Sequence, residues 1–64
     1  MAKVTFAHLR ELRYCVPGVK RFCARHGIEL REFRDGVETE RMRATGDRYA
    51  RIVADLAEQR ERDA

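Results

Sequence analysis

Three glycines, Gly27, Gly36 and Gly46, stand nine or ten residues apart, and this spacing is the strongest constraint on the fold. Each glycine follows a short segment whose apolar residues recur with the 3.6-residue period of an α-helix. Glycine readily adopts the left-handed backbone that ends many helices, so each one predicts a helix end. No segment alternates with the two-residue period of a strand. We therefore predict an all-α fold, a compact single domain of four or five short helices with no sheet.

The chain has 64 residues, enough for one small domain. Because a chain of this size buries only about 60% of its unfolded surface, its core must be small. We expect the core within residues 5–57, and we expect the charged tail 58–64 to fray. The apolar residues available for the core are Phe6, Leu9, Leu12, Val16, Val19, Phe22, Ile28, Leu30, Phe33, Met42, Tyr49, Ile52, Val53 and Leu56.

The first half of the chain predicts two helices. Thr5 is suited to cap a helix over about 6–14. Pro17 suits the first turn of a second helix that runs to about His26, because proline has no N–H to leave unpaired. Gly27 then fits the left-handed position after that helix. The apolar stripe of the second helix is Val19, Phe22, Cys23 and His26.

The second half predicts two short helices and one longer one. The short ones cover about 29–34 and 38–44, and Asp47 is a good N-cap for a final helix over about 48–61. The apolar face of that helix is Tyr49, Ile52, Val53 and Leu56. We expect this face to pack against the first two helices, with Phe22 and Ile52 central in the core. A homodimer that buries it is the alternative, because the core is so small.

The charge is distributed unevenly. Residues 1–34 carry eight lysines or arginines and three acids, whereas residues 35–64 carry six arginines and eight acids. Twelve of the fourteen basic residues are arginine, whose planar guanidinium binds carboxylates and phosphates. Ordinary solvated helix faces explain such a distribution well; the functional alternative is a contact surface on the first two helices. The candidate partner-binding residues are Arg10, Arg13, Lys20, Arg21 and Arg25.

The sequence does not favour a metal site or a catalytic site. Cys15 and Cys23, with His8 and His26, make a nominal Cys2His2 set, but none of their spacings is the close cysteine pair that anchors structural zinc. Cys23 belongs to an apolar stripe, where a free cysteine packs as a small hydrophobe. We find no nucleophile-and-base pair, phosphate-binding glycine loop or carboxylate dyad. We therefore predict a protein that is not an enzyme and needs no metal or other cofactor.

A helix-turn-helix is the main nucleic-acid alternative. The segment 22–28 resembles the end of a first helix followed by a turn glycine and an apolar residue. However, Gly36 predicts that the next helix stops after about six residues, which is short for a major-groove recognition helix. The outward acids of that short helix, Glu29, Glu32 and Asp35, would also repel phosphate, and Arg31 and Arg34 only partly offset them.

Several motifs resemble those of a group of very small proteins from tailed-phage and prophage genomes of proteobacteria. These motifs are His8-Leu9-Arg10, Tyr14-Cys15, Gly18, Phe22-Cys23-Ala24-Arg25-His26-Gly27-Ile28, Phe33, Asp35-Gly36-Val37 and Ala44-Thr45-Gly46-Asp47. The similarity covers about residues 5–56. In those relatives the position of Cys23 is often aromatic, which supports a packing role for this residue. The resemblance implies a phage-encoded accessory protein without an assigned activity.

Together these observations predict a non-enzymatic helical module that binds a phage or host protein. The role is virion morphogenesis or modulation of a host protein; the alternative is a small basic nucleic-acid-binding protein. No apolar run approaches the ~18 residues of a membrane span. The segment 1–4 lacks the apolar region of a signal peptide. We therefore expect no membrane partner and a location in the bacterial cytoplasm or on the virion.

Overall fold

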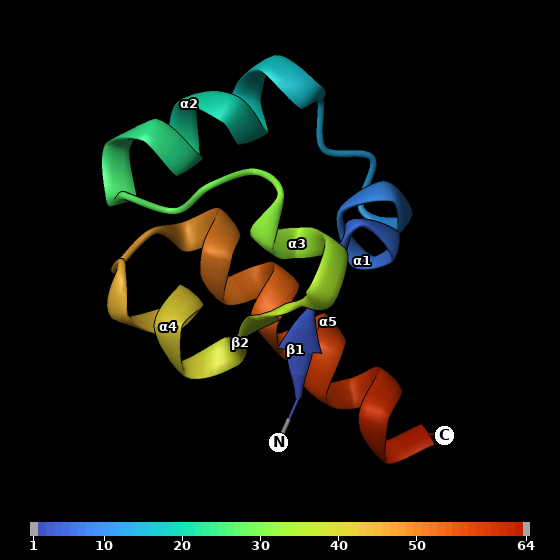
Figure 1. Cartoon of the computed structure of the whole chain (residues 1–64). Helices are drawn as coiled ribbons and strands as arrows, with labels where there is room; N and C mark the ends of the chain where they lie inside the picture. Colours follow the sequence, from blue (N-terminus) through green and yellow to red (C-terminus); the bar gives the residue numbers. More distant parts are fainter. Residues whose placement is uncertain (1, 64) are drawn as a thin grey trace.

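The computed structural model describes residues 2–63, which are mostly helical and carry one small sheet (Figure 1). In chain order the elements are β1 (Lys3–Val4), α1 (Phe6–Glu11), α2 (Val16–His26), α3 (Glu32–Asp35), β2 (Val37–Glu38), α4 (Thr39–Ala44) and α5 (Arg48–Asp63). The five helices of this part of the chain agree with the predicted number. The prediction that there is no sheet is wrong.

The sheet consists of β1 and β2, which pair in antiparallel register with Lys3 opposite Glu38 and Val4 opposite Val37. Both valines are buried, and Val4 has no exposed surface. Each strand has two residues, so neither is long enough to show the alternation by which strands are predicted. The two buried valines pack in the core, and this packing stabilises a strand pair that would be too short to form alone.

Helix α1 begins at the predicted cap and ends earlier than predicted. The Thr5 N–H donates to Nδ1 of His8, 3.0 Å away, which satisfies one main-chain donor at the helix start. After Glu11 the chain turns, because Arg13 adopts the left-handed backbone conformation with φ 58°. The Tyr14 N–H then donates to the Leu9 carbonyl at 3.1 Å. This bond closes the turn, so α1 ends three residues before the predicted position.

Helix α2 ends as the sequence predicted. Gly27 has φ 68°, and its N–H donates to the Cys23 carbonyl. The Ile28 N–H donates to the same carbonyl at 3.0 Å, and the Ile28 side chain is buried. Cys23 is buried as well, and this burial raises the pKa of its thiol. The predicted packing role of Cys23 is therefore confirmed.

The segment that follows α3 depends on Gly36. Helix α3 has four residues, fewer than the predicted 29–34, and Gly36 after it has φ 107°. A Cβ at Gly36 would lie 2.7 Å from the Lys3 Cβ. Glycine is thus required both by the backbone conformation and by the close passage of β1. Strand β1 therefore lies directly against the backbone at Gly36.

Helix α5 begins at the predicted cap and continues to Asp63. Oδ1 of Asp47 accepts the Tyr49 N–H at 2.8 Å and the Ala50 N–H at 3.4 Å. The segment from 58 to 63, which we expected to fray, is helical in the structure. There Arg60 forms an ion pair with Glu11 of α1. This pair joins the final turns of α5 to the end of α1.

The buried face of α5 differs from the predicted one. Tyr49 is 63% exposed and Ile52 is 38% exposed, so the prediction that Ile52 is a central core residue is wrong. The buried residues of α5 are Ala50, Val53, Ala54 and Ala57. Alanines on this face let the helix axis approach its neighbours closely, which turns the larger side chains of Tyr49 and Ile52 outward. The helical period of the apolar residues is predicted correctly. The face of α5 that packs on the core is rotated about the helix axis relative to the predicted face.

The core forms where α5 packs against α4, β1 and α1. Its largest fully buried side chains are Phe33, Met42, Val4 and Val53. Besides Tyr49 and Ile52, two more residues predicted for the core lie at the surface, Val16 at 59% exposed and Phe6 at 37%. The prediction that Phe22 is central is also wrong, because Phe22 is half-buried at the edge of the core. Among residues 2–63 no helix is long and apolar enough to cross a membrane.

Candidate functional site

The principal hollow of the described structure is an apolar groove of about 390 Å³ between α2 and the start of α5. Its α2 side presents Val19 and Phe22, its α5 side presents Tyr49, and the buried Val53 lies at its floor. Leu9, Tyr14, Phe33, Met42 and Ala50 supply further lining. Helix α2 lies apart from the packed unit of α4, α5 and the sheet, as Figure 1 shows. The groove exists because α2 packs less closely on the rest of the molecule.

The α2 side of the groove is an amphipathic helix face. Val19 and Phe22 are half-buried, and the Phe22 ring contacts the His26 ring with centroids 4.7 Å apart. Nε2 of His26 is buried and has no hydrogen-bond partner in the described part of the chain. The stripe predicted from the sequence thus faces inward, yet only Cys23 in it is fully buried. The remaining apolar surface faces the groove.

Two basic residues stand on the α2 rim. Arg21 and Arg25 lie one helical turn apart, both are exposed, and both line the groove. Neither forms an ion pair with another residue of the 2–63 segment. Side chains spaced i and i+4 share one helix face, so both guanidinium groups can reach a ligand seated in the groove. These two arginines are the predicted site residues that the structure brings together.

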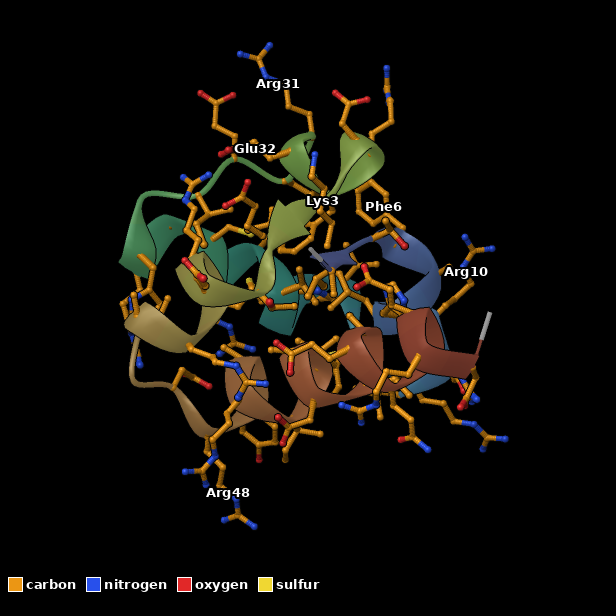
Figure 2. The ribbon with its side chains drawn as sticks, turned by 90° about the horizontal axis from the view of Figure 1, so that it is seen from below. Lys3, Phe6, Arg10, Arg31, Glu32 and Arg48 are labelled. Atoms are coloured by element: carbon orange, nitrogen blue, oxygen red, sulfur yellow. The ribbon has the colours of Figure 1, made fainter. Side chains whose placement is uncertain are left out.

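The other three predicted site residues do not line the groove. Arg10, Arg13 and Lys20 are exposed on α1, on the turn after it and on α2. Figure 2 shows the Arg10 side chain directed into solvent from α1. These three residues also make no ion pair within the described chain. The predicted five-residue surface is therefore one pair at a groove and three separate basic residues.

The opposite rim contains residues that the sequence analysis did not name as site residues. Asp47 lines the groove, but its carboxylate already accepts main-chain N–H groups at the start of α5. A smaller hollow next to it is lined by Arg43, Gly46, Asp47, Arg48 and Arg51. Arg48 points outward from the molecule (Figure 2). Arg48 and Arg51 belong to the half of the sequence with a net negative charge. Even so, neither forms an ion pair within residues 2–63.

Three acids outside the lining of the groove are paired with other arginines. Arg43 binds Asp55 at 2.6 Å and Glu58 at 2.8 Å. Arg60 binds Glu11. Because these acids serve pairs away from the groove, its rim retains positive charge.

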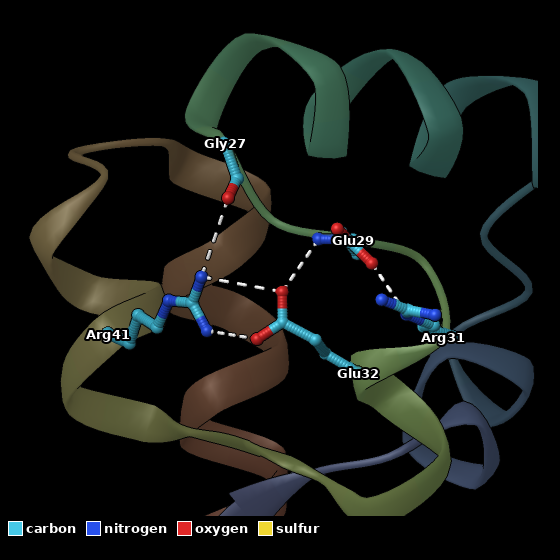
Figure 3. Close-up of polar contacts among 5 residues, drawn as sticks. All are labelled: Gly27, Glu29, Arg31, Glu32 and Arg41. Atoms are coloured by element: carbon cyan, nitrogen blue, oxygen red, sulfur yellow. Dashed lines mark hydrogen bonds and ion pairs between the residues drawn. The ribbon is translucent and has the colours of Figure 1, made fainter.

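A separate polar network fixes the connection from α2 to α3 (Figure 3). The Glu32 carboxylate accepts from the Arg41 guanidinium and from the Glu29 N–H, the latter at 2.7 Å. Arg41 also reaches the Gly27 carbonyl at 3.5 Å. The hydrogen bond from Arg41, and then the one from the Glu29 main chain, lower the pKa of Glu32. The network therefore ties the loop after α2 to α4.

This geometry bears on the helix-turn-helix alternative. The helix in the recognition position, α3, has four residues and about one turn, which presents little surface to a major groove. Glu29 in the loop before it pairs with Arg31 at 2.6 Å, and both side chains are largely exposed. The segment therefore exposes acid as well as base where DNA phosphates would approach.

The cysteines and histidines occupy different environments. Cys15 is an exposed free thiol that lines the groove, whereas Cys23 is buried. Nδ1 of His8 is engaged by Thr5 at the start of α1. Within residues 2–63 there is no group of three or more side chains of His, Cys, Asp or Glu placed to hold a metal ion. Cys15 is thus a thiol within the candidate site that reagents can reach.

No protein-family model, no curated protein and no solved structure matches this chain.

Proposed function

We propose that this chain is a non-enzymatic protein-binding module whose contact surface is the groove between α2 and α5. The observation that carries this proposal is an apolar hollow with two arginines, Arg21 and Arg25, on its rim that form no ion pair within residues 2–63. Interfaces commonly combine a desolvated apolar centre with arginine or aromatic anchors. Phe22, Tyr49 and the two arginines supply these components.

The apolar lining favours a protein partner over nucleic acid. Phosphate contacts alone would use the arginines but leave Val19, Phe22 and Tyr49 without a ligand group to contact. A protein segment can fill the groove with apolar side chains and meet the arginines with carboxylates. Charge complementarity of this kind sets the register and the rate of association.

The resemblance to small proteins of tailed phages suggests the setting in which that partner is made. We propose an accessory protein that acts in an infected or lysogenic bacterium. Its partner is then a virion component under assembly or a host protein that the phage modifies. Both roles are compatible with the same docking groove.

Alkylation of Cys15 provides a direct test. Cys15 is exposed in the groove, whereas burial raises the pKa of the Cys23 thiol. A bulky maleimide near neutral pH should therefore modify Cys15 selectively. Tagged protein, alkylated or not, is then used to capture proteins from infected or lysogenic cells. We expect alkylation to abolish capture of the specific partner while the helical circular dichroism spectrum is retained.

The Cys15→Ser variant treated with the same reagent is the control and should capture normally. Equal capture by alkylated and untreated protein would contradict the groove as the site. A duplex DNA shift measured on the same samples tests the alternative function. That alternative is favoured by the unpaired Arg10, Arg13 and Lys20 on the α1–α2 side. Tight, salt-sensitive DNA binding that alkylation leaves unchanged would replace our proposal.

A further inference from the structure

We infer that the segment seated in the groove is an amphipathic α-helix that presents acidic residues to Arg21 and Arg25. This inference rests on the proposed function and specifies the partner's chemistry. It is carried by the combination of a helix-lined apolar groove with unpaired positive charge on its rim.

The walls of the groove favour a helical ligand. Both walls are helices, α2 and α5, whose main-chain groups are largely satisfied within each helix. An extended peptide laid between them would find few main-chain partners and would leave its own N–H and C=O groups unpaired. A helix satisfies these groups internally and offers a side-chain face. Helix-in-groove binding is therefore the mode that suits these walls.

The lining specifies the apolar face of that helix. Val19 and Phe22 on one wall and the exposed ring of Tyr49 on the other offer apolar surface, and the volume of about 390 Å³ accommodates a few side chains rather than a whole domain. Apolar residues spaced i, i+3 or i+4, and i+7 project from one side of a helix. Two or three such residues would fill the groove and exclude water from it.

The rim specifies the charge. Arg21 and Arg25 are one turn apart, and side chains with that spacing lie about 5–6 Å apart at Cβ. Carboxylates one turn apart on a ligand helix have the same separation, so two ion pairs form without distortion. The acid on the opposite rim, Asp47, is held by the N-terminus of α5, and Arg48 lies beside it. Basic residues on the ligand would instead face Arg21 and Arg25, or Arg48 on the opposite rim. These arginines form no ion pair within residues 2–63, so they would repel such a ligand.

A selection experiment tests both features before the cellular partner is identified. A library of single helices on a rigid helical scaffold, randomised along one face, is selected against the full chain. We expect enrichment of apolar residues at i, i+3 or i+4, and i+7, flanked by Asp or Glu one turn apart. Alkylation of Cys15 should prevent these peptides from binding. That result would show that they bind in the groove.

A charge exchange then tests the arginines. The best peptide is measured by fluorescence anisotropy against the native chain and against the double variant Arg21→Glu with Arg25→Glu. We expect the double variant to weaken binding by roughly tenfold or more, since reversed charges repel at an interface. Replacing the two acids of the peptide with lysine should restore affinity for the variant and reduce it for the native chain.

The matched control is Arg10→Glu with Lys20→Glu, which changes net charge equally at residues outside the groove. It should bind the acidic peptide nearly normally, and both double variants should retain the helical spectrum and melting temperature. Selection of neutral or basic peptides, no enrichment at all, or equal weakening by both double variants would overturn the inference. So would concentration-dependent dimerisation through the groove that peptides cannot displace. If alkylation blocks capture of the cellular partner but the charge exchange fails, the inference is lost and the proposed function stands.

Discussion

The Tyr14 hydroxyl donates a hydrogen bond to the main-chain carbonyl of Tyr49 at 3.2 Å, and the two rings meet edge to face with centroids 5.8 Å apart. Tyr14 lies between α1 and α2, and Tyr49 lies in the first turn of α5. Both line the groove, so this pair joins the connection before α2 to the α5 wall. Partial burial, which is the largest cause, raises the pKa of the Tyr14 phenol.

The Tyr14→Phe variant removes this hydrogen bond and keeps the ring contact. Because a hydrogen bond of this kind contributes about 0.5–1.5 kcal/mol, we expect a loss of free energy of unfolding at or below that range. Urea denaturation measures it. Binding in the groove should weaken as well, since one wall becomes less fixed. A Tyr14→Phe variant with unchanged stability and unchanged peptide affinity would show that the pair does not hold the groove in shape.

Alanine substitutions at Phe33 and Ile52 should differ in how much stability they remove. Phe33 is 1% exposed, whereas Ile52 is 38% exposed. Phe33→Ala creates a cavity and should cost about 3–5 kcal/mol, enough to unfold a domain of this size. Ile52→Ala removes a side chain that water already reaches and should cost clearly less than a buried truncation. Thermal melts followed by circular dichroism compare the two, and equal losses would contradict the observed orientation of α5.

Two glycines with positive φ should respond differently to alanine. Gly46 has φ 73° and open space around its Cβ position, so Gly46→Ala should cost about 1 kcal/mol from backbone conformation alone. Gly36→Ala adds backbone strain of about 1–3 kcal/mol to a clash with the Lys3 Cβ. We expect Gly36→Ala to be the less stable variant and to lose the β1–β2 pairing. Guanidinium denaturation, with amide exchange at Val37, tests this order.

Stability should decline in acid because three carboxylates have a lowered pKa in the folded state. The hydrogen bond from Arg60 lowers the pKa of Glu11, and the one from Arg41 lowers that of Glu32. The Thr39 side chain, and then Arg43, lower the pKa of Glu58. The unfolded chain therefore binds protons at a higher pH than the folded chain does.

The sign of the effect follows from that difference. Stability from these groups is fully present above their ordinary pKa of 4.5 and is lost as pH falls through the lower folded values. We expect the melting temperature to fall as pH drops below about 5, and to fall less steeply in high salt. Glu11→Gln and Glu58→Gln should flatten the profile. Glu61→Gln, which removes an acid without an ion pair in residues 2–63, should leave it unchanged.

The sequence predicts local features well because they depend on neighbouring residues. Thr5 and Asp47 are predicted as helix starts and Gly27 as a helix end, and each is confirmed by a main-chain hydrogen bond or by its φ. These signals arise within about one helical turn. The short strands escape prediction because Val4 and Val37 are brought together only by the tertiary fold.

The groove is not predicted from the sequence for the same reason. The sequence predicts only that Arg21 and Arg25 lie on the second helix. Their neighbours across the groove, Tyr49 and Asp47, belong to a segment far away in sequence. The rotation of α5 decides which of its residues line the groove, and it follows from close packing of alanines. Hydrophobic periodicity alone ranks alanine below tyrosine and isoleucine, so it selects the wrong stripe.

The position of β1 has a consequence for how the protein is made. Val4, fully buried, belongs to a strand that packs against α5, the last helix of the described chain. During synthesis α1 and the partner strand β2 leave the ribosome before α5, so they can meet β1 first. Since contacts between distant residues require the intervening chain to close, the contacts between β1 and α5 form late. The burial of Val4 is therefore completed only after α5 has emerged.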